Sequence, residues 1–118
     1  MCRAGSTGDF PKDIDSLAWF YGSSGGRPHP VGTKRPNAWA LYDMHGNVWE
    51  WCQDWYSEAY YRKSPVLDPM GPESGSLPVV RRGSFLFEAG DCRYALRTGI
   101  TPDYISGDLG FRLVRRKP

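Results

Sequence analysis

Three cysteines are the side chains of this sequence best suited to redox or soft-metal chemistry: Cys2, Cys52 and Cys92. Cysteine thiolates do such chemistry in pairs or clusters with short, regular spacing. Here the cysteines lie far apart, so no pair has metal-site spacing, and three thiols are too few for a disulfide scaffold. One disulfide plus one free thiol and a fully reduced chain both fit this count. No Ser/His/Asp pattern or phosphate-binding loop is present either.

The composition is typical of one small folded domain, residues 1–118. This length leaves no room for a second domain, and an aromatic share of 14% is too high for a disordered chain. The 14 glycines and 10 prolines predict irregular backbone and no long helices. A net charge of +2 is too weak to indicate a nucleic-acid partner.

The sequence also shows no address for a membrane or for export. No stretch approaches the roughly 20 apolar residues that cross a bilayer, so we expect no membrane partner. Residues 1–5 lack the apolar core of a secretory signal. The compartment is therefore not fixed by the sequence, and a cytoplasmic location is expected.

The clearest secondary-structure signal is an alternating run over residues 47–55. Trp49, Trp51 and Trp55 fall on one face of the predicted strand. The opposite face carries Val48, Glu50, Cys52 and Asp54. We expect the tryptophan face to lie in the core, because it would otherwise expose a large apolar surface.

Shorter segments complete the predicted fold. Further strands are expected over residues 79–82, 93–97 and 109–115, with a short strand or edge segment at 17–21. A helical turn is expected at 38–42, where Asn37 would cap it and Trp39 would face inward. A second is expected at 58–61, capped by Ser57. These elements predict a small, irregular, antiparallel α+β domain with long loops.

Seven segments, in order along the chain, resemble the formylglycine-generating-enzyme (sulfatase-modifying factor) family. They are CRAG at 2–5, RPNAWALYDMHGNVWEWCQDWY at 35–56, LDPMGPESGS at 67–76, VVRRGSF at 79–85, CRYALR at 92–97, TPD at 101–103 and GDLGFRLV at 107–114. The resemblance implies a variant of the C-type lectin-like fold, with short antiparallel strands and an open face built from loops.

The resemblance covers only the second half of the family domain, so the chain is interpreted as a partial domain that lacks the N-terminal portion. The missing elements would bury apolar surface, and large exposed apolar patches favour association. We therefore expect a partner chain or self-association to cover that surface, or else limited stability.

The family's founding enzymes oxidise a substrate cysteine with two redox cysteines, which also bind copper, just after a Gly-Gly-Ser motif. Here the motif reads Arg82-Gly83-Ser84, with Arg82 in place of the usual glycine. Phe87 stands where the first catalytic cysteine is expected, the loop is shorter, and Cys92 aligns with the segment that leads into the next strand. We therefore expect no copper and no catalytic residue. A second, iron-dependent branch needs several histidines, or two histidines and a carboxylate, on one metal. Only His29 and His45 are present, and His45 lies in a turn that the resemblance assigns to the whole family, so we expect no iron chemistry.

The resemblance implies a calcium site at four residues: Asp43, Gly46, Val48 and Glu50. Two side-chain oxygens and two backbone carbonyls would converge there, and calcium prefers oxygen ligands. The alternative is that the two carboxylates bond backbone amides and arginines around the turn. Arg112, in the GFR motif, is expected to be structural. A Cys2–Cys92 disulfide is a further candidate that the resemblance suggests.

The resemblance also places a ligand-facing surface in the loops of residues 85–108. Its candidate residues are Phe85, Phe87, Glu88, Asp91, Tyr94 and Tyr104. Aromatic anchors with polar groups between them are typical of partner contacts, and ordinary packing is the alternative. We therefore expect a non-catalytic module that binds a protein or small-molecule ligand. The alternatives are an oxidoreductase acting on a peptide cysteine, or its degenerate remnant, and a variable protein of a diversity-generating retroelement, which shares this fold.

Overall fold

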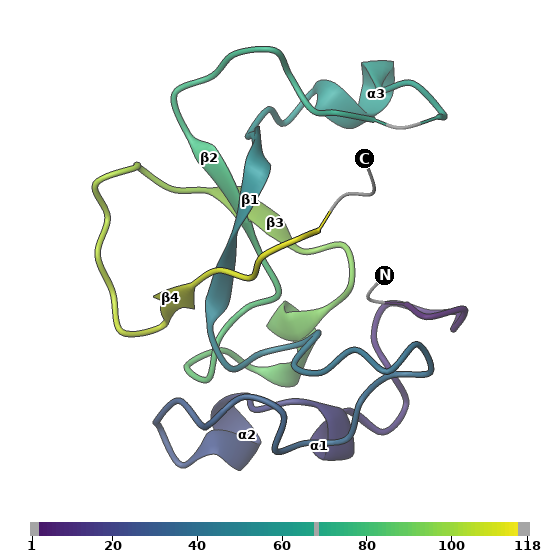
Figure 1. The fold of residues 1–118 in the computed structure, drawn as a ribbon, viewed down its shortest axis with the longest axis vertical. Coiled ribbons are helices and arrows are strands. Elements are labelled where there is room, and N and C mark those ends of the chain that lie inside the picture. Colours follow the sequence, from purple (N-terminus) through teal and green to yellow (C-terminus); the bar gives the residue numbers. More distant parts are fainter. Residues whose placement is uncertain (1–2, 68, 116–118) are drawn as a thin grey trace.

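One four-stranded sheet forms the centre of the computed structural model, which describes residues 3–67 and 69–115 (Figure 1). The strands are β1 (Trp49–Trp55), β2 (Pro78–Arg81), β3 (Arg97–Gly99) and β4 (Leu109–Gly110), in the spatial order β3-β2-β1-β4. Strand β2 is antiparallel to β1 and β3, whereas β4 runs parallel to β1. The predicted α+β class is confirmed, but the purely antiparallel arrangement is wrong. The chain passes through β2 and β3 before it returns to β1, and such a long return allows parallel pairing.

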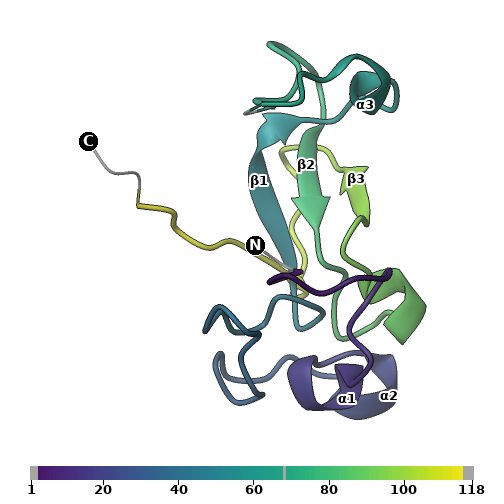
Figure 2. The same ribbon diagram turned by 90° about the vertical axis from the view of Figure 1, so that its right-hand side faces the viewer.

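Single-turn helices lie at the two ends of the sheet, with α1 and α2 at one end and α3 at the other (Figures 1 and 2). The helices are α1 (Ile14–Leu17), α2 (Tyr21–Ser24), α3 (Tyr60–Lys63) and the 3-10 helix η1 (Ala89–Cys92). Their shortness agrees with the glycine and proline content. None of the helices in the described ranges is long and apolar enough to cross a membrane.

The segment 17–21 is not a strand, so that prediction is wrong. It connects α1 to α2 and contributes one isolated parallel bridge between Trp19 and Gly46. The N–H of Asn47 donates to the Trp19 carbonyl at 2.6 Å. The segment therefore supports the turn that precedes β1 instead of extending the sheet.

The helical turn predicted at 38–42 is also wrong. The side-chain oxygen of Asn37 accepts hydrogen bonds from the backbone N–H groups of Trp39 and Leu41 at 3.0 and 3.1 Å. These bonds close a local asparagine turn that competes with helix formation. Trp39 consequently faces outward and is 58% exposed.

The predicted strand at 93–97 is displaced, because β3 begins only at Arg97. The backbone N–H of Tyr94 donates to the carbonyl of Asp9 at 2.8 Å, which ties this part of the chain to the N-terminal loop. The strand predicted at 109–115 is shortened to the two residues of β4. Beyond β4 the chain leaves the sheet and projects from the molecule (Figure 2).

The remaining predictions are nearly correct in position. Strand β2 matches the predicted strand at 79–82 with a shift of one residue at each end. Helix α3 begins at Tyr60, two residues later than predicted, and has no side-chain cap. Ser57 contributes its backbone carbonyl, which accepts from the Tyr60 N–H at 3.3 Å.

The interior holds almost as many polar as apolar side chains. The buried apolar residues among those described are Ile14, Ala18, Phe20, Met44, Val79, Val80, Phe85 and Cys92. The buried polar residues are Ser24, Asp43, His45, Asn47, Glu50, Ser84 and Asp108. Trp49, Trp51 and Trp55 are only half-buried, so the prediction that they form the core is wrong. Glu50, on the opposite face of β1, is the buried residue of this strand.

Candidate functional site

The turn that leads into β1 is held in an unusual conformation by backbone hydrogen bonds. Asp43, Gly46 and Asn47 all have positive φ angles, of 51°, 64° and 61°. A Cβ atom on Gly46 would lie 2.1 Å from the carbonyl oxygen of Trp19, so only glycine fits there. The Gly46 N–H donates to the carbonyl of Arg82 at 2.8 Å. The turn thereby fixes three segments around the start of β1.

Two arginines bind the Glu50 carboxylate from different parts of the chain. The Nε atom of Arg82 lies 2.8 Å from Oε2 of Glu50, and both side chains are about 90% buried. Arg112 donates from Nε to Oε2 at 2.7 Å and from Nη2 to Oε1. It also donates to the backbone carbonyls of Tyr42 and Asp43. Hydrogen bonds to ionised groups are stronger than neutral ones, so this cluster locks β1 to the loops beside it.

Asp43 is buried with one carboxylate oxygen satisfied and one not. Its Oδ2 accepts from the N–H of Gly32 at 2.7 Å. Its Oδ1 is buried and has no hydrogen-bond partner among the described residues. Asp43, Val48 and Glu50 line one open cavity of about 450 Å³, so the structure brings together three of the four residues predicted to bind calcium. Gly46 lies next to them in the turn but does not line the cavity.

Calcium at these residues stays a prediction, and the arrangement does not fit the ion. The carboxylate of Glu50 is already paired with two guanidinium groups, those of Arg82 and Arg112. Within residues 3–67 and 69–115, no group of three or more Asp, Glu, His or Cys side chains is placed to hold a metal. The arginine bonding that the sequence left as the alternative is what the structure shows for Glu50.

The six residues predicted to face a ligand are distributed over different environments. Phe85 is buried, and its N–H donates to the carbonyl of Asn47 at 2.8 Å. Glu88 and Asp91 are exposed, beside and within η1. Phe87 and Tyr104 come together from separate loops, whereas Tyr94 lines a different cavity.

Phe87 and Tyr104 line a small cavity that we call the aromatic pocket. It measures about 200 Å³, and its other lining residues are Trp49, Val80, Thr98, Ile100, Asp108 and Leu109. The rings of Trp49 and Phe87 meet edge to face, with centroids 5.3 Å apart. Phe87 is 37% exposed and Tyr104 is 49% exposed, so the pocket opens to solvent.

Asp108 lines the aromatic pocket and is held in place by hydrogen bonds. It is buried, and its Oδ2 accepts a hydrogen bond from the hydroxyl of Ser84 at 2.8 Å. Its Oδ1 accepts from the hydroxyl of Ser106. The backbone carbonyl of Asp108 accepts from the N–H of Trp49 at 2.7 Å. The Asp108 carboxylate therefore stabilises the loop before β4, and both of its oxygens already accept hydrogen bonds.

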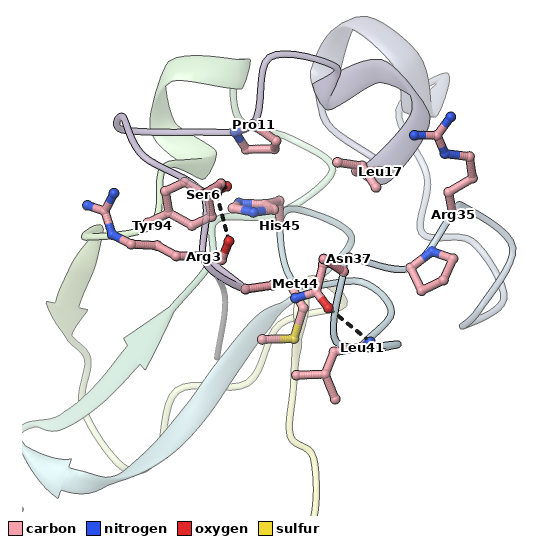
Figure 3. Close-up of a pocket in the computed structure, with 13 residues that line it drawn as sticks. Arg3, Ser6, Pro11, Leu17, Arg35, Asn37, Leu41, Met44, His45 and Tyr94 are labelled. Carbon is pink, nitrogen blue, oxygen red and sulfur yellow. Dashed lines mark hydrogen bonds between the residues drawn. The ribbon is translucent and has the colours of Figure 1, made fainter.

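His45 and Tyr94 line a second cavity of about 190 Å³, on the side of the N-terminal loops (Figure 3). Nδ1 of His45 donates to the carbonyl of Cys92 at 2.7 Å. Burial lowers the pKa of His45, and the positive charge of Arg82 lowers it further against the opposing effect of that hydrogen bond. The guanidinium groups of Arg3 and Arg35 point away from the centre of this cavity, so they form no anion site there (Figure 3).

The cysteines of the described chain are not arranged for redox chemistry. Cys52 and Cys92 are free, and Cys92 is fully buried. Burial raises the pKa of Cys92 to about 12, and the charge of Asp91 adds to this effect. Its thiolate is therefore disfavoured, and a thiolate is the nucleophile in thiol chemistry. The candidate Cys2–Cys92 disulfide is not formed at Cys92, and Cys2 lies outside the described residues.

Short strands, single-turn helices and cavities lined by loops define a small mixed α+β domain whose candidate sites depend on its loops. The sequence matches the model of the sulfatase-modifying factor enzyme 1-like domain over residues 5–117. The chain belongs to this family, as its motifs predicted.

Three similar proteins show the range of this family. A formylglycine-generating enzyme of Streptomyces coelicolor is 50% identical over 86 residues, which are 70% of this chain and 27% of that protein. A mouse protein named inactive C-alpha-formylglycine-generating enzyme 2 is 33% identical over 111 residues, which are 89% of this chain and 30% of the mouse protein. Among solved structures, Treponema denticola variable protein 1 aligns with a TM-score of 0.80 at 33% identity, over 93% of this chain and 41% of that one. The chain thus spans less than a third of the length of these two curated relatives.

Two features of the sites were not expected from the sequence alone. From the sequence, Arg82 stands out only as a replacement for glycine. Its ion pair with the buried Glu50 is seen only in the structure. Trp49 was assigned to the core, and the pocket that it lines with Leu109 depends on the parallel pairing of β4. That pairing has no local sequence signature.

Proposed function

We propose that this chain is a non-catalytic binding module that holds an apolar or aromatic group of a protein or small-molecule ligand in the aromatic pocket. The observation that carries the proposal is the convergence of Trp49, Phe87 and Tyr104, from three separate segments, on one open cavity. Tryptophan and tyrosine are enriched among the residues that dominate binding energy, and a preformed cavity gives them a defined partner.

The size of the aromatic pocket suggests the kind of group that it holds. Its volume of about 200 Å³ is below the roughly 300–1,000 Å³ of pockets that enclose drug-sized ligands. A single aromatic or branched side chain is therefore a better occupant than a whole cofactor. Exposed Glu88 lies close in sequence to Phe87 and would add a polar contact at the rim.

A non-catalytic role is supported by the chemistry of the loop that contains Phe87. In the family resemblance, this phenylalanine stands at the position of the first redox cysteine. The nearby Cys92 is buried with a raised pKa. The similarity to a mouse protein whose name calls it inactive shows that members without the activity occur among the relatives.

We also propose that another polypeptide, either a partner chain or a second copy, covers the segment after β4. Phe111, Leu113 and Val114 are 73%, 89% and 69% exposed, and this segment projects from the sheet (Figure 2). Exposed apolar side chains grouped in this way favour association. Sedimentation velocity checks the second copy: a dimer supports it, whereas a monomer at all concentrations leaves the partner chain as the occupant to be sought.

The binding proposal is tested with N-acetylphenylalaninamide as the probe, titrated against the protein and followed by tryptophan fluorescence and by NMR. We expect saturable binding that Phe87→Ala weakens by at least about tenfold, because the lost ring contact is worth more than about 1.4 kcal/mol. Leu86→Ala is the matched control, since Leu86 is exposed but does not line the pocket. Equal binding by both variants contradicts the proposed site.

The parent oxidase activity is the second candidate, favoured by the 50% identity to the Streptomyces enzyme. Its test is the oxidation of a peptide cysteine to an aldehyde by the purified chain, with copper and oxygen supplied. Under the binding proposal no aldehyde forms. A copper-dependent turnover would replace the proposed function.

A further inference from the structure

Arg82 occupies a backbone position that favours glycine. Its φ angle is +87°, in the region that L-amino acids with a side chain rarely adopt. The motif that this segment resembles carries glycine at the same place, so the arginine is a departure from that motif. A residue held in such a conformation needs compensation from the contacts of its side chain.

The compensation comes from Glu50. The Arg82 side chain is 11% exposed, and its Nε lies 2.8 Å from the Glu50 carboxylate, which is 10% exposed. Charges at this depth are screened little by solvent, so a matched pair is far more stable than either charge alone. Arg82 therefore acts as a fixed positive charge at Glu50, which lines the cavity of about 450 Å³ together with Asp43.

The local charge is balanced without any added ion. The carboxylates of Asp43 and Glu50 contribute two negative charges, and the guanidinium groups of Arg82 and Arg112 contribute two positive charges. A divalent cation between the carboxylates would raise the local charge to +2 in a buried place. It would also have to displace an arginine from Glu50.

An unpaired acceptor oxygen nevertheless remains beside this cluster. Oδ1 of Asp43 is buried without a hydrogen-bond partner in the described chain, and Asp43 lines the same cavity as Glu50. Arg82 reaches Glu50 but makes no bond to this oxygen. Arg112 lines the cavity and belongs to the GFR motif that the chain shares with the family it resembles. Arg82 does not line the cavity, but it reaches Glu50 and departs from the motif.

We infer that the guanidinium of Arg82 stands in for a divalent cation at Glu50, so that the wild-type chain does not bind calcium there and removal of Arg82 opens a calcium site. Asp43, Glu50 and the carbonyls of the turn would supply the oxygen ligands. The inference concerns only this cavity and does not depend on ligand binding in the aromatic pocket.

The experiment compares thermal unfolding and calorimetric calcium titrations of the wild type and Arg82→Gly, each with millimolar calcium or with EDTA. Glycine both removes the guanidinium and relieves the positive φ angle. We expect an unchanged midpoint for the wild type and a calcium-dependent rise of at least about 5 °C for Arg82→Gly. The double variant Glu50→Gln/Arg82→Gly should lose most of that rise.

Arg81→Gln is the matched control, because it removes the neighbouring positive charge while leaving Glu50 paired. It should behave as the wild type does. Arg82→Gln provides a second test if the glycine variant does not fold with or without calcium, since it keeps most of the side-chain volume but not the charge. Calcium stabilisation of the wild type equal to that of the variants overturns the inference. So does the absence of any calcium effect in the variants that fold.

Discussion

The two faces of strand β1 are filled in opposite ways. On one face Glu50 is buried between Arg82 and Arg112, and on the other Trp49 is half-buried at the aromatic pocket. The alternation of the sequence predicts the reverse, with the tryptophans inside. On the polar face, arginines from two distant segments satisfy the buried carboxylate of Glu50. The apolar face stays open because no described segment covers it completely, and this leaves it available for binding.

The largest effect that tests this comparison is expected from Glu50→Gln. The substitution leaves the buried guanidinium of Arg82 and the partly exposed guanidinium of Arg112 without their counter-charge. Breaking a buried pair in this way costs about 3–5 kcal/mol. Urea unfolding measures the change in the free energy of unfolding. Arg35→Gln is the control, because its ion pair with Asp13 is 70% and 60% exposed and is worth about 0–1 kcal/mol. Similar losses for the two variants would show that Glu50 is not effectively buried.

A smaller difference is expected between two phenylalanines that stand two positions apart. Phe85 is 7% exposed, and Phe85→Ala should cost about 3–5 kcal/mol because it opens a cavity in the interior. Phe87 is 37% exposed, so Phe87→Ala should cost only about 1–2 kcal/mol. Denaturant unfolding of both variants measures the difference. Equal losses would mean that Phe87 belongs to the core and that the pocket is not an open binding surface.

The sequence predicted the class of fold and the main strand, but not which face of that strand is buried. Trp49 and Glu50 alternate as expected, and the period of a strand fixes only that they lie on opposite faces. The burial of Glu50 depends on Arg82 and Arg112, which lie far from Glu50 along the chain. Long-range pairing of this kind leaves no local pattern.

The candidate sites were predictable to a similar extent. The family motifs predicted a calcium site that includes Asp43 and Glu50, and the structure places both residues around one cavity without testing the ion. They did not show that Arg82 pairs with the Glu50 carboxylate. A motif gives residue types, but it does not show which group a substituted side chain contacts. Asn37 likewise gave the correct hydrogen-bonding residue but the wrong local structure, since its side chain closes a turn in place of a helix.

The smallest expected effect is a pH dependence from His45, which is buried in the turn before β1. Burial is the main reason that the pKa of His45 is lowered from 6.5, with the charge of Arg82 as an additional cause. The unfolded chain therefore binds a proton near pH 6.5 that the folded chain binds only at lower pH. The contribution of His45 to the free energy of unfolding should be constant above about pH 6.5. It should fall as the pH decreases toward the lowered pKa of the folded state.

Urea unfolding at a series of pH values from neutral to mildly acidic measures this slope, and the His45→Gln variant isolates its source. Glutamine keeps an amide N–H donor but does not titrate. The variant should therefore lose the part of the slope that lies just below pH 6.5. An unchanged slope in His45→Gln would place this histidine in solvent. The turn that leads into β1 would then be as open to solvent as the aromatic pocket, and the contrast between these two regions would fail.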